Sequence, residues 1–179
     1  TKIKTCFANL YSTTGKDNIV RFPDNGGKPY GVAVEHLLLI TNKLGLKVDI
    51  KKESGKEIND VINVFPALRR KGKYISDYKG IRKCTKRLEE GEIDIMTYLV
   101  KSQIFLRSDI ENYIHLIKYM STNDQYINTD PSSIQVGFDH PLYIGLSKKS
   151  KYSSLSLKIG SIVNTLKKEF VDAQKVLFT

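Results

Sequence analysis

A helix that ends at a glycine and continues directly into a strand occurs twice in this 179-residue chain. The first unit spans 31–50 and breaks at Gly45, and the second spans 81–96 and breaks at Gly91. Glycine suits the left-handed residue that ends a helix. Helix–strand units repeated along a chain predict a parallel sheet that is covered by helices. Ligands of such sheets bind in the loops beyond the carboxyl ends of the strands.

The other elements follow from hydrophobic periodicity and from turn residues. We expect strands at 3–9, 46–50, 93–96 and 142–146, and helices at 31–44, 81–90, 109–119 and 157–170, with a final helical turn at 171–178. The segments 11–27 and 121–141 are polar and rich in turn residues, so both are predicted to be loops. Strand 46–50 alternates apolar residues with charged ones, as a strand near a sheet edge does.

The composition is that of an ordinary soluble globular protein, with 40% hydrophobic and 27% charged residues. The length fits one domain or two small lobes. The longest apolar run, Leu37 to Ile40, is far too short to span a bilayer.

The net charge of +10 favours an anionic partner such as nucleic acid, a membrane face or a small ligand, or it is a basic surface that keeps the protein soluble. The basic run 69–87 interleaves Tyr74 and Tyr78, a pattern that nucleic-acid-binding proteins use for phosphate contact and base stacking. The same cations also suit the solvated side of helix 81–90. We favour that interpretation and expect no nucleic acid as partner. The purpose of the basic insertion 53–79 does not follow from its sequence.

Cys6 and Cys84 are the only cysteines, too few for a disulfide framework or a zinc ribbon. Cys84 is a buried thiol on an apolar helix face, or it forms a bridge to Cys6 if the first strand lies under that helix.

Catalysis, a metal ion and a cofactor are not expected. The three histidines are scattered, and His36 suits a satisfied core histidine on a buried helix. No nucleophile elbow and no phosphate-binding glycine loop is present. Asp94, between two isoleucines, is expected to pair or cap near its strand rather than to act as an acid.

Polar and aromatic side chains follow two of the predicted parallel strands. Asn9 and Tyr11 follow the first strand, and Thr97 and Tyr98 follow strand 93–96. Their hydroxyls and flat rings suit a small molecule, and Arg107 is able to clamp a carboxylate through a bidentate fork. In the alternative interpretation the tyrosines only pack and Arg107 lies on the surface.

Four segments together resemble the extracytoplasmic solute-binding proteins of ABC transporters, in particular the amino-acid-binding family 3. The segment 28–35 is similar to the family's Pro-Tyr-Gly start of the first helix, and 44–48 to its helix-to-strand step. Segment 88–95 resembles the Leu-x-x-Gly-x-Ile-Asp signature, and 143–150 the late strand that leads into a return helix. The pieces occur in the family's order and cover about half of the chain.

The resemblance implies the α/β fold of periplasmic-binding proteins of type II, with a parallel-sheet lobe that has helices on both faces. Residues 1–100 and 151–179 are expected to form lobe 1, and 101–150 the hinge and a remnant of lobe 2. The second lobe is expected to be incomplete, because only about thirty residues separate the predicted hinge from the late strand, and a single βαβ unit takes that many.

The resemblance also implies site residues. Arg107 is the nearest match to the arginine that clamps the ligand carboxylate in this family, and Tyr11 holds the place of the aromatic residue that stacks on the ligand. Tyr30 in the Pro-Tyr-Gly segment completes the candidate ligand-binding set with Asn9 and the pair that follows strand 93–96.

We therefore expect a monomeric, non-enzymatic protein in the periplasm or another extracytoplasmic space, with its export signal removed or not included. It would capture a small polar or anionic solute, an amino acid or another carboxylate, and deliver it to a membrane permease. The alternatives are a ligand-sensing regulatory module with the same fold or a nucleic-acid-binding protein that uses the basic run.

Overall fold

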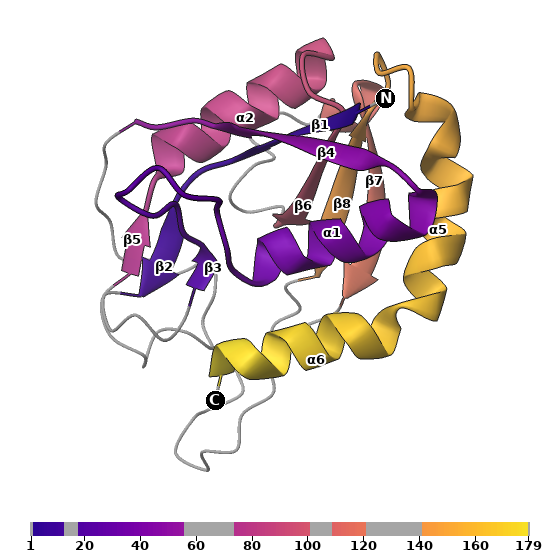
Figure 1. Cartoon of the computed structure of the whole chain (residues 1–179). Coiled ribbons are helices and arrows are strands. Elements are labelled where there is room, and N and C mark those ends of the chain that lie inside the picture. The colour runs from indigo at the N-terminus through magenta and orange to yellow at the C-terminus, as the bar shows by residue number, and fades with distance from the viewer. Residues whose placement is uncertain (1, 13–17, 56–73, 101–108, 121–140, 179) are drawn as a thin grey trace.

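The computed structural model describes residues 2–12, 18–55, 74–100, 109–120 and 141–178 (Figure 1). The elements, in chain order, are β1 (Lys2–Phe7), β2 (Leu10–Ser12), β3 (Asn18–Val20), α1 (Val32–Leu44), β4 (Lys47–Lys52), β5 (Tyr74–Ser76), α2 (Tyr78–Glu90), β6 (Ile95–Leu99), the 3₁₀ turn η2 (Ile110–Asn112), β7 (Ile114–Met120), β8 (Leu142–Ser147), the 3₁₀ turn η3 (Ser153–Leu155), α5 (Ser156–Thr165) and α6 (Lys167–Phe178).

The central sheet has five strands in the order β4-β1-β6-β8-β7. β1 pairs in parallel with β4 on one side and with β6 on the other, which confirms the predicted parallel arrangement of these three strands. β4 lies at the edge of the sheet, as its alternating charges predicted. β8 runs antiparallel to β6, and β7 antiparallel to β8, so the sheet is mixed.

Both predicted helix–glycine–strand units are confirmed. Gly45 ends α1 with a φ of 70°, and Gly91 ends α2 with a φ of 81°. Each amide donates back to a carbonyl of the last helical turn, and a residue with a side chain adopts this left-handed conformation only at a cost. The two glycines thus return the chain from helix to sheet.

The predicted helix at 109–119 is wrong. The chain forms the short turn η2 there and then the strand β7, whose residues from Ile114 to Met120 pair with β8 along its length. Tyr113 and Ile117 are one helical turn apart, but a two-residue period fits as well: Ile114 and Leu116 pack in the core under α2, and Ile117 and Tyr119 pack in the core on the other face. Pairing with β8 decided between the two periods, since strand formation depends on tertiary partners.

The structure differs from the sequence prediction in two further segments, one near each end of the chain. The predicted loop 11–27 contains strands of a second, three-stranded sheet with the order β3-β2-β5. The predicted helix 157–170 is divided into α5 and α6 at Leu166. Leu166 and Phe170 are both buried, and the bend between the helices allows both side chains to reach the core.

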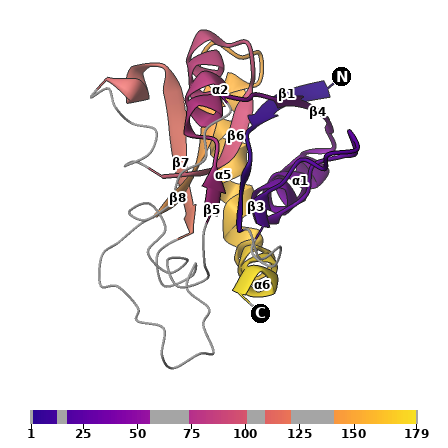
Figure 2. The same cartoon turned by 90° about the vertical axis from the view of Figure 1, so that its left-hand side faces the viewer.

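Helices cover both faces of the central sheet, as expected. Figures 1 and 2 show α1 and α2 on opposite sides of it. α1, α5 and α6 pack on one face around Leu37, Ile144 and Phe170. α2 packs on the other face through Leu88, against side chains that include Ile114.

Cys6 of β1 and Cys84 of α2 form a disulfide bond across the second of these cores. The structure thereby decides between the two alternatives for Cys84. The bridge requires that β1 lies under α2, which is the arrangement observed.

The expected division into lobes stays a prediction. β7 and β8 lie within 101–150, yet they extend the same sheet that contains β1. Among the described residues, no helix combines the length and the apolar character that crossing a bilayer requires.

Candidate functional site

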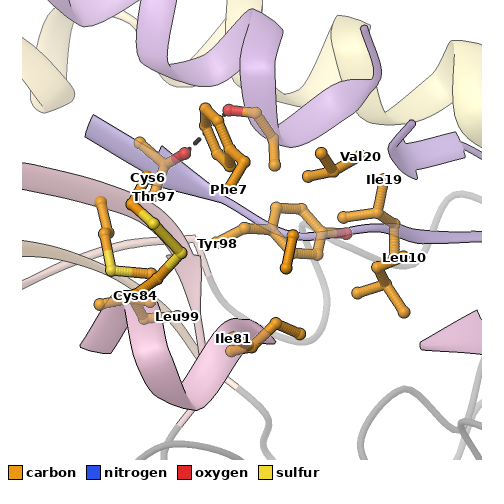
Figure 3. A pocket seen from close by; sticks show the side chains of 13 residues that line it. Cys6, Phe7, Leu10, Ile19, Val20, Ile81, Cys84, Thr97, Tyr98 and Leu99 are labelled. Atoms are coloured by element: carbon orange, nitrogen blue, oxygen red, sulfur yellow. Dashed lines mark hydrogen bonds between the residues drawn. A yellow bond between two sulfur atoms is a disulfide. The ribbon is translucent and has the colours of Figure 1, made fainter. Parts of the chain in front are cut away.

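A small cavity lies at the carboxyl ends of β1 and β6 (Figure 3). The first turns of α1 and α2 and the strands β2 and β3 complete its wall. Its volume is about 40 Å³. The side chains that face it include Phe7, Leu10, Val20, Ile81, Thr97 and Tyr98. The cavity therefore occupies the edge of the sheet where an α/β fold places its ligand.

The wall is almost entirely apolar. Within the described parts of the chain, its only side-chain hydroxyls come from Thr97 and Tyr98, and both residues are buried. The Thr97 hydroxyl donates to the carbonyl of Ala33 at 2.8 Å, which joins β6 to the first turn of α1. The Tyr98 hydroxyl lies 2.9 Å from Nε2 and 3.2 Å from Oε1 of Gln174 on α6. Both polar groups thus have partners within the protein.

Tyr98 has a backbone conformation that is unusual for a residue with a side chain, with a φ of 60°. Such a conformation costs about 1–3 kcal/mol and persists where the surroundings over-determine it. Its hydroxyl is bound by Gln174, and its backbone is hydrogen-bonded to the hydroxyl of Tyr119. The contacts of Tyr98 thereby set the direction of its ring at the cavity wall.

His36 of α1 lies behind this wall and is completely buried. Its Nε2 is 3.0 Å from the Phe170 carbonyl, which can only accept, so Nε2 carries the proton. Nδ1 therefore accepts from the Tyr119 hydroxyl at 2.9 Å. Burial lowers the pKa of His36 to about 4, and the hydrogen bond to Phe170 opposes only part of this change. His36 is thus a satisfied, neutral core histidine, as predicted.

Burial also raises the pKa of Tyr98 and the pKa of Tyr119 well above the ordinary value of a phenol. Both hydroxyls stay protonated at neutral pH. They serve as hydrogen-bonding groups and do not act as bases there.

Of the six predicted ligand-binding residues, Thr97 and Tyr98 line the cavity. Asn9 lies nearby but uses its side-chain oxygen to accept from the backbone amide of Phe22 at 2.8 Å. Its carbonyl accepts from the amide of Asp77 at 2.9 Å, so it connects β1 to the start of α2. Arg107 lies outside the described residues.

The other two predicted residues do not line the cavity, and both lie beside Arg21. Tyr11 of β2 is half-buried, and the guanidinium of Arg21 lies 4.3 Å from the centre of its ring. Tyr30 is 45% exposed, and its backbone exchanges two hydrogen bonds with that of Arg21. The structure thus brings these two tyrosines to one arginine rather than to the cavity.

Two residues near the site were missed by the sequence analysis. Asp77 is the N-cap of α2, and it accepts from the amides of Gly80 and Gly55, each at 2.9 Å. An Asp three residues before a helical glycine is a recognisable capping signal. Gln174 had no such signal, because its partner Tyr98 is 76 residues away in the sequence.

Asp94 lies at the other end of the sheet, before β6. One oxygen accepts from the amide of Lys4 at 2.8 Å, and the other from the hydroxyl of Ser150 at 2.6 Å. Its role is structural, as predicted. Nowhere in the described ranges do three His, Cys, Asp or Glu side chains gather as they would around a metal ion.

The described cations of the basic run lie along the outer side of α2. Arg87 pairs with Glu53 and Glu92, and Lys83 donates to the carbonyl of Ser54. This arrangement fits the predicted solvated helix face, with part of its charge neutralised by the chain itself. The run's first residues, 69–73, lie outside the described residues.

Comparison with protein-family models gave no match, and comparison with curated protein sequences gave none either. Solved structures do match. The arginine-bound amino-acid ABC transporter substrate-binding protein AbpA from Streptococcus pneumoniae aligns with a TM-score of 0.52 and 10% identity, over 98% of this chain and 96% of that one. The arginine-specific periplasmic binding protein STM4351 from Salmonella typhimurium aligns with a TM-score of 0.53 and 9% identity, over 99% and 100%.

A histidine kinase sensor domain with similarity to periplasmic binding proteins aligns comparably, with a TM-score of 0.54 and 8% identity, over 99% of this chain and 95% of that one. Identities this low show a shared fold. The chain therefore has the predicted fold of periplasmic-binding proteins of type II.

Proposed function

We propose that this chain is a non-enzymatic binding module that captures a small solute at the carboxyl edge of its central sheet. The observation that supports this most strongly is the cavity between the first turns of α1 and α2. Ligands of open α/β sheets bind at such a position, and the chain shares its fold with binding proteins for amino acids.

Recognition without catalysis agrees with the chemistry of the wall. The two hydroxyls at the cavity, those of Thr97 and Tyr98, are already hydrogen-bonded inside the protein. A general base needs a pKa near the working pH, whereas burial raises the pKa of Tyr98. In the described part of the wall, no carboxylate or imidazole faces the cavity to take the role instead.

The disulfide between Cys6 and Cys84 supports an extracytoplasmic location, because such bonds persist mainly in oxidising compartments. In that setting the partner would be the permease of an ABC transporter, and the module would act as a monomer. The solute would be an amino acid or another small carboxylate, as for the substrate-binding proteins of the same fold.

We assign the solute carboxylate to Arg107 and the cavity wall to Thr97 and Tyr98. The proposed ligand-binding set also includes Asn9, Tyr11 and Tyr30, which do not line the cavity. Titration calorimetry with a panel of amino acids and organic acids tests the function. The Arg107→Ala variant is expected to weaken binding about tenfold or more, because it removes a charge-assisted hydrogen-bonding fork.

The control is Lys86→Ala, which removes one positive charge from the exposed side of α2. It is expected to leave the affinity unchanged. If no member of the panel binds to the intact protein, the proposed function is wrong. If Lys86→Ala weakens binding as much as Arg107→Ala does, overall charge and not a clamp attracts the solute.

The match to a histidine kinase sensor domain favours a second candidate, a sensing module that signals ligand occupancy to an output domain. It uses the same site, so binding data do not separate it from transport. A transmembrane or output segment fused to this chain in the full gene product would support sensing. A permease gene beside it would support transport.

A further inference from the structure

The cavity is small, and its size limits what can enter it. A cavity needs a volume of about 10–15 Å³ to hold one water molecule. The cavity's 40 Å³ therefore holds about three groups, each about as large as a water molecule. Side chains such as those of arginine or phenylalanine are too large to enter it.

The wall also limits the chemistry of what can enter. Phe7, Leu10, Val20 and Ile81 face the cavity, and each is buried. Among the residues that the structure describes, no charged side chain lines it. A charged or hydrogen-bonding group placed there would lose its water, and the two wall hydroxyls, those of Thr97 and Tyr98, are already engaged by Ala33 and Gln174. An apolar wall of this kind favours an apolar group over water, because the group's apolar surface is then removed from water.

The wall is stabilised against expansion from three sides. The Cys6–Cys84 disulfide connects β1 to α2, and both cysteines line the cavity. Hydrogen bonds join Thr97 to α1 and Tyr98 to α6. Close-packed interiors of this kind accept a group of matching volume and resist larger ones.

We propose that this cavity is the specificity pocket for a linear aliphatic group of about three carbon atoms, so that the solute is a small amino acid or carboxylate with an apolar side chain. The proposal rests on the proposed function, and it narrows the solute from a polar or anionic class to an aliphatic one. The charged end of the solute stays outside the cavity.

A series of ligands that differ only in side-chain length provides the test. Glycine, alanine, 2-aminobutyrate, norvaline and norleucine are titrated calorimetrically into the intact protein. Affinity should rise about fourfold for each added methylene group, since burying one is worth about 0.8 kcal/mol. It should peak at norvaline, whose side chain has three carbons, and fall at norleucine. Serine should bind more weakly than 2-aminobutyrate, because burying its hydroxyl costs desolvation and the two wall hydroxyls already have partners in the protein.

Two variants change the cavity in opposite directions. Ala33→Leu adds three carbons to the wall and should remove the gain beyond alanine. Leu10→Ala enlarges the cavity and should shift the optimum to norleucine or longer chains. The control is Leu157→Ala on α5, whose side chain is 88% exposed, and it should leave the whole series unchanged. Because the two cavity variants act oppositely, failure of one to fold still leaves the other to decide.

The outcomes distinguish failure of the pocket assignment from failure of the proposed binding function. If arginine or glutamate binds and the alkyl series shows no rise, the pocket assignment is overturned while the binding function stands. A series that peaks at norvaline but does not shift in either folded variant also overturns it. If nothing in the series or in a wider panel of amino acids binds, both the pocket and the binding function are rejected.

Discussion

His36 lies where α1, β7 and α6 meet, and its two ring nitrogens are both used. Nε2 donates to the Phe170 carbonyl, and Nδ1 accepts from Tyr119. The rings of Tyr119 and Phe170 also pack edge-on against the imidazole, with centroids 5.4 and 5.1 Å away. The neutral imidazole fits this site, whereas a second proton would meet the Tyr119 hydroxyl proton and would lack water.

At this scale we predict a loss of stability in mild acid. The pKa of His36 is about 4 in the folded protein and about 6.5 in the unfolded chain, so the unfolded chain binds the extra proton between these values. The stability that the neutral His36 contributes to the fold is complete above pH 6.5 and is lost as the pH falls towards 4. The full difference corresponds to about 3 kcal/mol in the free energy of unfolding.

Urea denaturation at pH 7.5, 6 and 4.5 measures this effect. Carboxylates titrate over part of the same range, so the comparison is with His36→Gln, which should show a smaller decrease. His115→Gln serves as the comparison: burial and the charge of Lys148 lower the pKa of His115 too, but His115 is partly exposed on β7, so its replacement should reduce the pH dependence less than His36→Gln does. Equal pH dependence in the wild-type protein and His36→Gln would contradict the assignment.

At the scale of elements, the first turn of α1 approaches β3 very closely. A Cβ atom on Gly31, with its φ of 133°, would collide with the carbonyl of Ile19. β3 contributes Ile19 and Val20 to the cavity wall, so this contact sets the distance between α1 and that wall. Gly160 in α5 is the opposite case, since a Cβ atom there meets nothing within 4 Å.

The two glycines should therefore respond oppositely to alanine. Gly31→Ala is expected to destabilise the protein by about 2 kcal/mol or more, because backbone must move and the φ suits only glycine. Gly160→Ala is expected to stabilise it by about 0.5–1 kcal/mol, the usual gain inside a helix. Thermal unfolding of both variants beside the wild type measures the two effects. A loss of stability in Gly160→Ala would contradict the expectation, because it would mean that other atoms occupy the space beside Gly160 on α5.

At the scale of the whole molecule, one mixed sheet with helices on both faces holds the described parts of the chain together (Figure 2). The Cys6–Cys84 bridge adds a covalent connection between the first strand and α2, across a sequence separation of 78 residues. The cavity lies directly beside this bridge.

Reduction of the bridge should lower stability substantially. Closing a loop of this length restricts the unfolded chain and is worth about 4 kcal/mol in the chain-entropy model. Urea denaturation with and without dithiothreitol measures the change. The Cys6→Ala/Cys84→Ala double variant should be less stable and no longer respond to the reductant. An unchanged denaturation midpoint after confirmed reduction would contradict the expected contribution.

Much of the fold could be predicted because its signals are local. Gly45 and Gly91 mark helix ends by their backbone conformation, and the alternation in 46–50 marks an edge strand. For Cys84 the sequence left open whether it is a buried thiol or forms a bridge to Cys6, since the geometry of a bridge depends on how β1 and α2 pack. Of the candidate site residues, Thr97 and Tyr98 line the cavity; the sequence predicts them directly after a strand at 93–96, whereas they lie within β6, Ile95–Leu99.

Local sequence therefore accounts for the helix–glycine–strand units, which need only backbone preferences and hydrophobic period. Tertiary structure alone decided that 114–120 is a strand, because β8 supplies the pairing that outweighs the helical period. It also decided that Gln174 and Tyr119 surround Tyr98, and that the cavity is small and apolar. These features arise where segments far apart in the chain meet, and their packing energy has no counterpart in any single stretch of sequence.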